Sequence, residues 1–494
     1  MSKEKKASQK VTTKAANESG PSFFSFLLSK ENWVNLGLFF GLHLLIFIFL
    51  KIYYPYPATE TDSGNYILSA INGKINGYRP MGYSSFLAFF GTFSNDIQFV
   101  VTWQWFVTML CSFFFVFTLH YIYRLKNYLL WALIVLLSLN PSAIFLNAYL
   151  MSDGLFINLT LAFLAAGLWV AYRKSYAMLA LHLFLLYLSM HTRYIGLFYP
   201  AISILFIVIG FLPKWKIGLA LSVLPIAIVL LYRNSVTGQM EEEFGVKTFS
   251  AFGGWQKANN GVAILPFEKI DTSKMTDNEV KYVHQIVRQF PDSVFSTEQV
   301  MATSFMWVKE FPGKAVLFNY IQQTNTTYLK SWAYVGTMME KYGDFLQSNY
   351  RGAYFSHFIL PNVKNIVKVY DIDEKAEFGT DQNTKTFFAT DVDKYTFKKQ
   401  WFKPLTAIRQ IAEYLLWLLF ILSLAGMAKI ALDKKLSVQE RLGILTVPAF
   451  VVAFCLASAY AAPINNFRYM MPIYGSQLML IFVVANYFLA KKPN

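Results

Sequence analysis

Long apolar runs, separated by short polar connections, dominate the pattern along this chain. A helix rises about 1.5 Å per residue and the hydrocarbon layer of a membrane is about 30 Å thick, so a crossing helix needs about 20 mostly apolar residues. Ten segments meet this requirement approximately. We therefore expect about ten transmembrane helices, at 33–54, 98–123, 128–147, 154–172, 176–190, 195–212, 217–232, 407–430, 442–462 and 469–489.

The polar connections alternate in charge. The connections on one side of the membrane, together with the N-terminal tail, are rich in Lys and Arg, and basic residues concentrate on the cytoplasmic side of a membrane protein. Both termini are thus expected to be cytoplasmic, which agrees with ten crossings, because an even number returns the C-terminus to the side of the N-terminus. The residues that carry this charge in the connections are Arg124, Lys126, Arg173, Lys174, Lys214, Lys216, Lys429, Lys434, Lys435, Arg441, Lys491 and Lys492.

Composition agrees with a membrane protein, since 55% of the 494 residues are hydrophobic and only 15% are charged. The formal net charge is +15, but the basic residues do not form long runs with interleaved aromatics, so we expect no nucleic-acid partner. Cys111 and Cys455 each lie inside an apolar segment, where a thiol acts as a small hydrophobic group. We expect an integral, multi-pass membrane protein.

These patterns divide the chain into four parts. Residues 1–32 form a cytoplasmic basic tail, 33–232 an N-terminal transmembrane region with a first outer loop at 55–97, 233–405 an extracytoplasmic domain, and 406–494 a C-terminal transmembrane region. The expected class is mainly α, a polytopic helix bundle with a mainly helical outer domain. Segment 233–405 is long enough for a small domain of its own.

Helix signals occur within segment 233–405. Two matches to the Ser/Thr-x-x-Glu/Gln capping box begin at Thr276 and Ser296, and each precedes helix-spaced apolar residues. Pro312 is expected to open a further helix, because proline is favoured at the first helical position. We expect an irregular glycine-rich entry at Gly253 and Gly254, and a loose, charged exit over 371–394.

Ionisable residues from distant parts of the sequence share one membrane face in this topology. Charged groups near membrane depth mark functional sites when they line a cavity, and we expect these to gather in one pocket open to the outer leaflet. They are Asp62, Arg79, Asp153, His191, Arg193 and Arg468.

The first outer loop supplies carboxylates at Glu60 and Asp62 and a guanidinium at Arg79. An arginine meets phosphate oxygens through two parallel donors and stays charged when partly desolvated, so this loop can hold a base and a phosphate clamp. In an arbitrary loop, Asp62 would more often cap a helix and Arg79 would extend to the membrane interface. The shared outer-face location favours the functional interpretation here.

The other members of this set have structural alternatives. Asp153 has the position of an N-cap for the fourth span, a role that does not exclude catalysis or metal binding. His191, Arg193 and Arg468 are also compatible with simple interfacial anchors, because such residues are common at that depth. No member is diagnostic alone.

Other polar residues within the spans are expected to be structural. His43 and His182 lack an acidic partner at matching depth, and Arg409 precedes Glu413 by four residues, the spacing of a helical ion pair. No HExxH, CxxC pair, P-loop or GxSxG motif occurs, so zinc-protease, phosphate-loop ATPase and serine-hydrolase functions lack support.

With these residues identified, the chain resembles the GT-C superfamily of polytopic membrane glycosyltransferases, near its aminoarabinose-transferase and protein-mannosyltransferase branches. The resemblance rests on the order and common location of four features across most of the membrane region. They are Asp62 four residues before Tyr66, Arg79-Pro80, the turn Met151-Ser-Asp153-Gly, and Arg468-Tyr469 with Pro472.

The resemblance implies transfer of a sugar from a polyprenyl-phosphate-linked donor, entering from membrane lipid, to an extracytoplasmic glycan, lipid or protein acceptor. It also implies a location in the bacterial inner membrane, with the active site on the periplasmic face. Asp62 would act as the catalytic base in an inverting reaction, with Asp153 supporting the acceptor or a divalent metal ion. The remaining substrate-binding residues would be Arg79, Tyr66, Tyr83, His191, Arg193 and Arg468. A fixed cation beside the leaving phosphate would stabilise its charge.

The sequence departs from the family pattern at one informative place. Many relatives carry adjacent acidic residues in the first outer loop, whereas Ser63 follows Asp62 here, which puts the use of a metal ion at Asp62 and Asp153 in doubt. Trp255 and the 307–312 stretch are candidates for sugar contact, although packing into the outer domain is the simpler interpretation. A transporter or flippase of a lipid-linked or small anionic solute, or a membrane scaffold, remains the alternative.

Overall fold

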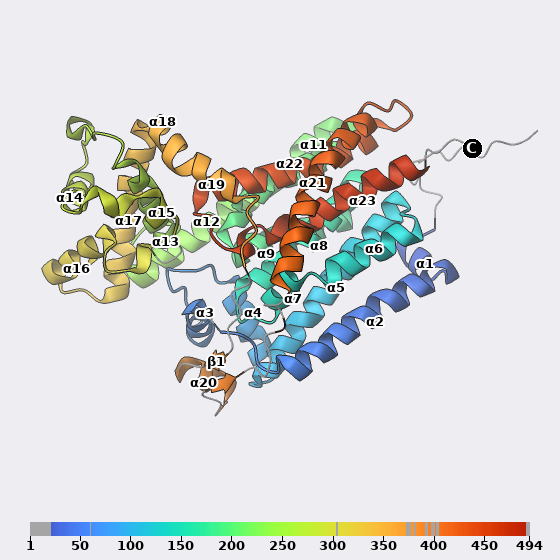
Figure 1. Ribbon diagram of the computed structural model, residues 1–494, viewed down its shortest axis with the longest axis horizontal. Coiled ribbons are helices and arrows are strands. Elements are labelled where there is room, and N and C mark those ends of the chain that lie inside the picture. Colours follow the sequence, from blue (N-terminus) through green and yellow to red (C-terminus); the bar gives the residue numbers. More distant parts are fainter. Residues whose placement is uncertain are drawn as a thin grey trace, which may run out of the picture.

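The computed structural model describes residues 21–59, 61–302, 305–371, 377–379, 382–390, 394–396, 401 and 405–490. Most of the expected basic tail, Glu60 and most of the charged exit therefore lie outside the described residues. The chain forms a long helix bundle with a smaller group of helices, α13 to α18, at one end (Figure 1). The start of α2 and the end of α23 lie at the opposite end, close to each other in this view.

Seven of the ten expected segments are helices long and apolar enough to cross a membrane. Six are formed by α2 (Lys30–Tyr53), α5 (Ile97–Tyr123), α8 (Ser152–Arg173), α21 (Thr406–Ala431), α22 (Val438–Ala461) and α23 (Tyr474–Ala490). The seventh, Leu212–Phe244, joins α11 (Trp215–Leu221) and α12 (Val223–Phe244). The expected domain boundary at 232/233 therefore falls inside a continuous helix.

The other three expected segments are bent or short. Helices α6 (Asn127–Ser138) and α7 (Pro141–Asn147) meet at 49°, because Pro141 cannot continue a helix and Asn140 caps the new one through its side chain. Helices α9 (Tyr176–Thr192) and α10 (Tyr199–Gly210) are apolar but shorter than a typical crossing. The described chain is thus mainly α, with seven clear candidate spans.

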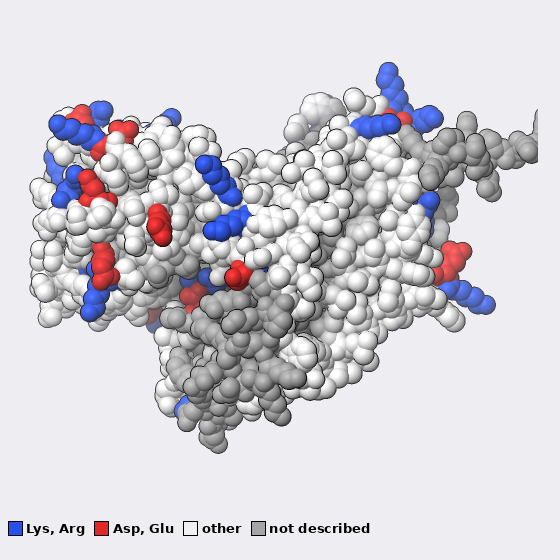
Figure 2. Space-filling view, viewed as in Figure 1, with Lys and Arg blue, Asp and Glu red and all other residues white. Residues whose placement is uncertain are grey.

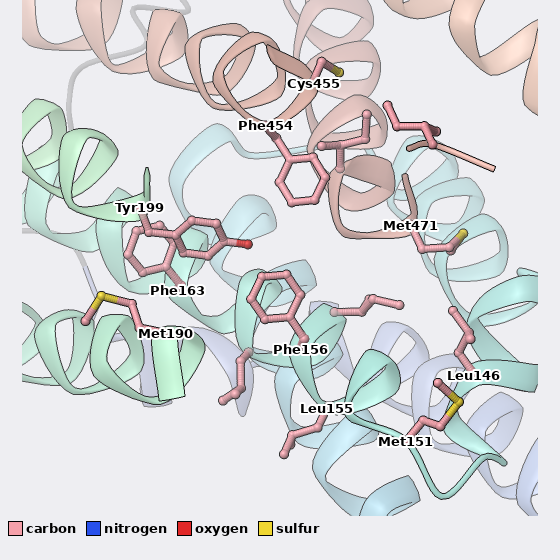
Figure 3. Close-up of a cluster of buried hydrophobic side chains, with 14 of the residues drawn as sticks. Leu146, Met151, Leu155, Phe156, Phe163, Met190, Tyr199, Phe454, Cys455 and Met471 are labelled. Atoms are coloured by element: carbon pink, nitrogen blue, oxygen red, sulfur yellow. The ribbon is translucent and has the colours of Figure 1, made fainter. Parts of the chain in front are cut away.

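Helix α8 is the centre of the bundle. Its candidate span is fully buried, and it packs against α5, α9, α10 and α22. A helix that is apolar on all sides is expected in such a position. Phe156 and Phe163 of α8 lie beside Tyr199 of α10 and near Phe454 of α22, as Figure 3 shows.

The surface has the polarity of a membrane protein. Figure 2 shows charged side chains at the two ends of the visible face and an almost uncharged surface between them. Large apolar side chains such as Leu45, Leu231 and Leu418 are exposed on the spans. Such exposure suits contact with lipid, whereas water would penalise it.

The segment after α12 is helical, as expected. It contains α13 (Ala251–Gly261), α14 (Asn278–Val287), α15 (Thr297–Met301), α16 (Pro312–Thr324), α17 (Tyr328–Asn349), α18 (Arg351–Tyr354) and α19 (Leu360–Asn365). Pro312 occupies the first turn of α16, and the Ser296 side chain caps α15, both as predicted. The predicted cap at Thr276 is wrong, because Asp277 accepts the N–H groups of Glu279 and Val280 instead.

The expected irregular entry at Gly253 and Gly254 is also wrong, because both residues lie within α13. The absence of a side chain at Gly254 lets α13 approach α17 closely. A Cβ atom there would lie 1.9 Å from the Gly336 carbonyl oxygen. Gly254 therefore serves helix packing rather than a turn.

The charged exit from this segment is only partly described. It contains the short helix α20 (Gln382–Phe388) and a two-stranded antiparallel pair of β1 (Glu377–Gly379) and β2 (Lys394–Thr396). Three further short helices lie near the start of the described chain. Helix α1 (Phe23–Leu27) precedes α2, and α3 (Thr61–Asn72) and α4 (Gly82–Gly91) lie in the first outer loop.

Candidate functional site

Backbone pairing brings the first outer loop to the start of the central helix. Ala58 N–H donates to the Ala148 carbonyl, and the Ala58 carbonyl accepts from Leu150 N–H, both at 3.0 Å. The Ser63 hydroxyl adds a hydrogen bond to the Leu150 carbonyl at 2.8 Å. These contacts hold the N-terminus of α3, which carries Asp62, against the N-terminus of α8, which carries Asp153.

Asp62 and Arg79 form an ion pair inside the first outer loop. Nη2 of Arg79 lies 2.9 Å from both carboxylate oxygens of Asp62, and each side chain is about one-fifth exposed. The Asn76 side chain shapes the loop by accepting the N–H groups of Tyr78 and Arg79, while its amide donates to the Asn65 carbonyl of α3. The loop is therefore tied to the helix that carries its carboxylate.

Asp153 does not have the expected capping role. The N-cap of α8 is Met151, and Asp153 in the first turn is only 3% exposed. Its carboxylate instead accepts a hydrogen bond from Arg193, and the nearer Arg468 nitrogen lies 3.9 Å from its other oxygen. The expected anchors Arg193 and Arg468 thus turn inward and share one buried carboxylate.

The Asp62–Arg79 pair and the group formed by Asp153, Arg193 and Arg468 belong to one electrostatic cluster. Burial alone would raise the pKa of Asp62, but the positive charges of Arg79, Arg468 and Arg193 outweigh it and hold the pKa below its usual value. Asp62 is therefore an anion at neutral pH. We call the five side chains the charged cluster; with two carboxylates and three guanidiniums, it carries one net positive charge. Its members are Asp62, Arg79, Asp153, Arg193 and Arg468.

Several polar atoms of this region have no hydrogen-bond partner. Among the described residues, Arg79 Nε, Arg468 Nε, one Asp153 oxygen and His191 Nδ1 are buried without a hydrogen bond. Buried polar groups are normally paired, and an unpaired one costs about 1–3 kcal/mol. Four such atoms in one region indicate a site that a polar ligand completes.

Tyr66 and Tyr83 lie beneath the charged cluster. Both are buried, and their rings meet edge to face at 5.1 Å. The Tyr66 hydroxyl is bonded to the Ser152 hydroxyl, and Tyr83 donates to the Gln104 side chain. These contacts join α3 to α8 and α4 to α5, and direct contact of either tyrosine with a substrate remains a prediction.

An apolar cavity of about 460 Å³ adjoins the cluster. Its wall includes Pro80 and Met81, which follow Arg79, and His191, which precedes Arg193 by two residues. The rest is formed mainly by α9 and α12, through Leu183, Phe184, Tyr187, Ile228, Leu231 and Tyr232. Helices α4 and α9 approach each other closely at His191, since a Cβ on Gly82 would lie 2.5 Å from the His191 carbonyl oxygen.

The described residues do not suit a divalent metal ion at this place. No group of three or more His, Cys, Asp or Glu side chains with metal-binding geometry occurs in the part of the chain that is described. Asp62 and Asp153 are each engaged by guanidinium groups, which compete with a cation for the same oxygens. We derive no metal-dependent step.

The other predicted polar residues have structural contacts. His43 lies against the Phe39 carbonyl, and His182 bonds the Phe163 carbonyl and the Ser203 hydroxyl. Arg409 and Glu413 form the predicted pair at 3.0 Å, and Arg409 also donates to Ser142 and the Tyr370 carbonyl.

Sequence reasoning missed two residues that shape the site. Asn76 was detectable, because Asn-Gly is a turn signal and Gly77 has a φ of +75°. Phe252 lies with its ring centroid 4.6 Å from the Arg79 guanidinium carbon. No local signal marks Phe252, because its contact joins residues far apart in sequence.

Comparisons with known proteins add little to this geometry. No family model matches the sequence, and no curated protein does. A solved structure with a similar chain is the arabinosyltransferase EmbB from Mycobacterium smegmatis, with 13% sequence identity and a TM-score of 0.33. The likeness covers 92% of this chain and 41% of that one, so the chain spans less than half the length of the protein it resembles.

Proposed function

We propose that this protein is a membrane glycosyltransferase that moves a sugar from a polyprenyl-phosphate-linked donor to an extracytoplasmic acceptor. The observation that carries the proposal is the charged cluster, with its net positive charge, next to an apolar cavity whose wall includes Pro80, the residue after Arg79, and Tyr194, the residue after Arg193. A lipid-linked sugar phosphate has the matching parts: an apolar chain, an anionic phosphate and a polar sugar. Arginine suits the phosphate because its donors match phosphate oxygens in pairs.

Asp62 is the proposed base. The acceptor hydroxyl attacks the anomeric carbon, its proton passes to the Asp62 carboxylate, and the bond from that carbon to the phosphate oxygen breaks with inversion. Positive charge develops on the sugar and negative charge on the leaving phosphate. Arg79, with Arg193 and Arg468, stabilises the phosphate charge in a preorganised, partly dry site.

Arg79 also connects donor binding to the base. In this structure its guanidinium is bonded to Asp62, which lowers the carboxyl pKa and its basicity. A donor phosphate competes for the same guanidinium. Once Arg79 turns to the phosphate, Asp62 loses its strongest partner and becomes a better proton acceptor.

Asp153 has a positioning role in this proposal. It is buried and lies between the guanidiniums of Arg193 and Arg468, so it holds both arginines toward the cluster. The alternative roles in supporting the acceptor or a metal ion remain predictions.

The Asp62→Asn variant tests the proposed base. Removing a general base typically lowers the rate about 10²–10⁴-fold. We expect such a loss of sugar transfer in reconstituted membranes, while binding of the polyprenyl-phosphate donor to the purified variant is retained. Unaltered turnover by a folded variant would remove Asp62 from the mechanism.

Arg79→Ala and Lys74→Ala form a matched pair of charge removals in the same loop. Lys74 is an exposed surface residue paired with Glu243, whereas Arg79 contacts the proposed base. We expect kcat/KM for the donor to fall about 10²–10³-fold for Arg79→Ala, the cost of losing one stabilising donor, and to change little for Lys74→Ala. Equal, near-wild-type kinetics for both would refute the phosphate clamp.

A transporter would give a different product pattern. Mass spectrometry of cell-envelope glycans and glycolipids, with and without the protein, would show the loss of one sugar increment if it is a transferase. Redistribution of an intact lipid-linked sugar across the membrane, with no missing increment, would favour the transporter alternative.

A further inference from the structure

Three indole rings form a nearly parallel stack where the outer helices meet the first outer loop. Trp255 of α13 and Trp332 of α17 stack at 5.6 Å with an angle of 12°, and Trp307 continues the stack at 6.4 Å and 3°. The inner two rings are 1% exposed, whereas Trp307 at the end is 41% exposed. Trp307 is therefore a rigidly supported aromatic ring that is partly open to solvent.

A buried lysine lies beside this surface. Lys314 of α16 is 8% exposed, and its ammonium lies 5.3 Å from the Trp307 ring centroid and 5.7 Å from that of Trp255. Its one side-chain hydrogen bond goes to the Tyr328 hydroxyl at 3.3 Å. No carboxylate of the described residues lies within ion-pair distance of it. A buried ammonium normally has a charged partner, so the remaining donors of Lys314 suit an oxygen-rich ligand.

The surface adjoins the charged cluster through one intervening ring. Phe252 lies 4.6 Å from the Arg79 guanidinium carbon and stacks with Trp307 at 6.2 Å. The Tyr78 ring, next to Arg79 in sequence, lies 4.2 Å from Trp332 and 6.0 Å from Trp307. The distance from the Arg79 guanidinium carbon to the Trp307 ring centroid therefore cannot exceed the 4.6 Å and 6.2 Å contacts added together. A short oligosaccharide can span such a distance.

We propose that Trp307 and Lys314 form a saccharide subsite that holds the acceptor, so that the acceptor is a glycan rather than a protein or a simple lipid. The inference rests on the proposed function and specifies the acceptor class. A sugar ring presents C–H groups on one face, which suit the electron-rich face of an indole. Its ring or substituent oxygens accept hydrogen bonds from the Lys314 ammonium.

The chemistry of the surface favours a sugar over the other two acceptor classes. A lipid acceptor needs a continuous apolar groove, whereas this surface combines one flat ring with an ammonium and the Tyr328 hydroxyl. A peptide would pair its backbone with a strand edge or lay an amphipathic helix in a groove. The flat ring bordered by hydrogen-bond donors fits a carbohydrate.

The test uses the full-length protein in lipid nanodiscs, probed with an array of neutral and uronate-containing hexasaccharides. We expect wild-type protein to bind a subset of these sugars and Trp307→Ala to bind at least about tenfold more weakly, the loss of roughly 1.4 kcal/mol. Trp307→Phe keeps an aromatic face and should retain part of the binding. Phe318→Ala, which removes a similarly exposed ring on α16 outside the stack, is the matched control.

Two results would overturn the inference. One is no binding of any array sugar by the wild-type protein, and the other is equal binding by the wild type and Trp307→Ala, with both folded as judged by thermal unfolding. The proposed function fails separately. If Asp62→Asn keeps full transfer while Trp307→Ala loses sugar binding, the subsite stands and the mechanism does not. If Trp307→Ala keeps full sugar binding while Asp62→Asn loses transfer, the mechanism stands and the subsite does not.

Discussion

At the scale of single residues, arginine and aspartate pairing sets the chemistry. Arg79, Arg193 and Arg468 come from three distant segments, yet each lies within ion-pair distance of Asp62 or Asp153. The residue types and their common membrane face could be predicted from sequence. Which carboxylate pairs with which arginine could not, because that depends on how α3, α8 and the loops after α9 and before α23 pack.

The pKa of Asp62 leads to a pH prediction. In the free protein this pKa lies below its ordinary value of 3.8, and the acid limb of kcat/KM reports the base of the free enzyme. A base with a lowered pKa loses activity only as pH falls through that lowered value. We therefore expect that protonation of Asp62 causes no fall in kcat/KM between pH 7 and pH 3.8.

The matching variant is Arg79→Gln, which removes the nearest positive charge. We expect its residual activity to show an acid limb at higher pH than the wild type, because Asp62 then keeps its proton more readily. Measurement of kcat/KM against pH for both proteins checks this. A wild-type acid limb well above pH 3.8 that Arg79→Gln leaves in place would argue against Asp62 as the base.

At the scale of helices, close packing determined what local signals did not reveal. Gly253 and Gly254 were predicted to form an irregular entry, but they lie inside α13, and Gly254 faces α17. Sequence patterns alone cannot distinguish a glycine that turns the chain from one that allows two helices to touch. The cap at Ser296 and the helix start at Pro312 were predictable, because their signals are local.

Adjacent glycines offer a sharp test of this packing. At Gly254 an added Cβ would meet the Gly336 carbonyl at 1.9 Å, whereas at Gly253 its nearest neighbour is the Ser250 hydroxyl at 3.3 Å. We expect Gly254→Ala to destabilise the outer helices by about 1–3 kcal/mol or more. Gly253→Ala should be neutral or stabilising by up to about 1 kcal/mol, because alanine favours a helix.

Thermal unfolding and limited proteolysis of the solubilised protein would rank the stability of these variants. Because α13 carries Trp255, loosening this helix pair should also weaken the indole stack. Equal unfolding temperatures for the two alanine variants would contradict the close approach of α13 and α17.

At the scale of the whole molecule, charged side chains on the visible face gather on the outer helices as far as their junction with the bundle and at the opposite end of the bundle, and the bundle surface between them is almost uncharged (Figure 2). The helices of the bundle expose apolar side chains. The orientation predicted from basic connections places the outer helices outside the cytoplasm. Two exposed lysines suit a labelling test, Lys281 of α14 and Lys435 between α21 and α22.

We expect a membrane-impermeant thiol reagent, added to intact cells, to label Lys281→Cys but not Lys435→Cys. The native Cys111 and Cys455 are buried and should give little background. Labelling of Lys435→Cys after membrane permeabilisation is the positive control. The opposite pattern in intact cells would invert the predicted topology and place the charged cluster on the cytoplasmic side.

By itself the sequence determined the mainly helical class, the positions of the apolar segments and the candidate residues Asp62, Arg79, Asp153, Arg193 and Arg468. These follow from local composition and spacing, which the membrane and the helix impose on every chain. Tertiary structure alone decided the pairing within the charged cluster, the cavity between α9 and α12, and the indole stack beside Arg79. Each of these depends on contacts between distant segments, and such contacts leave no periodic signal in the sequence.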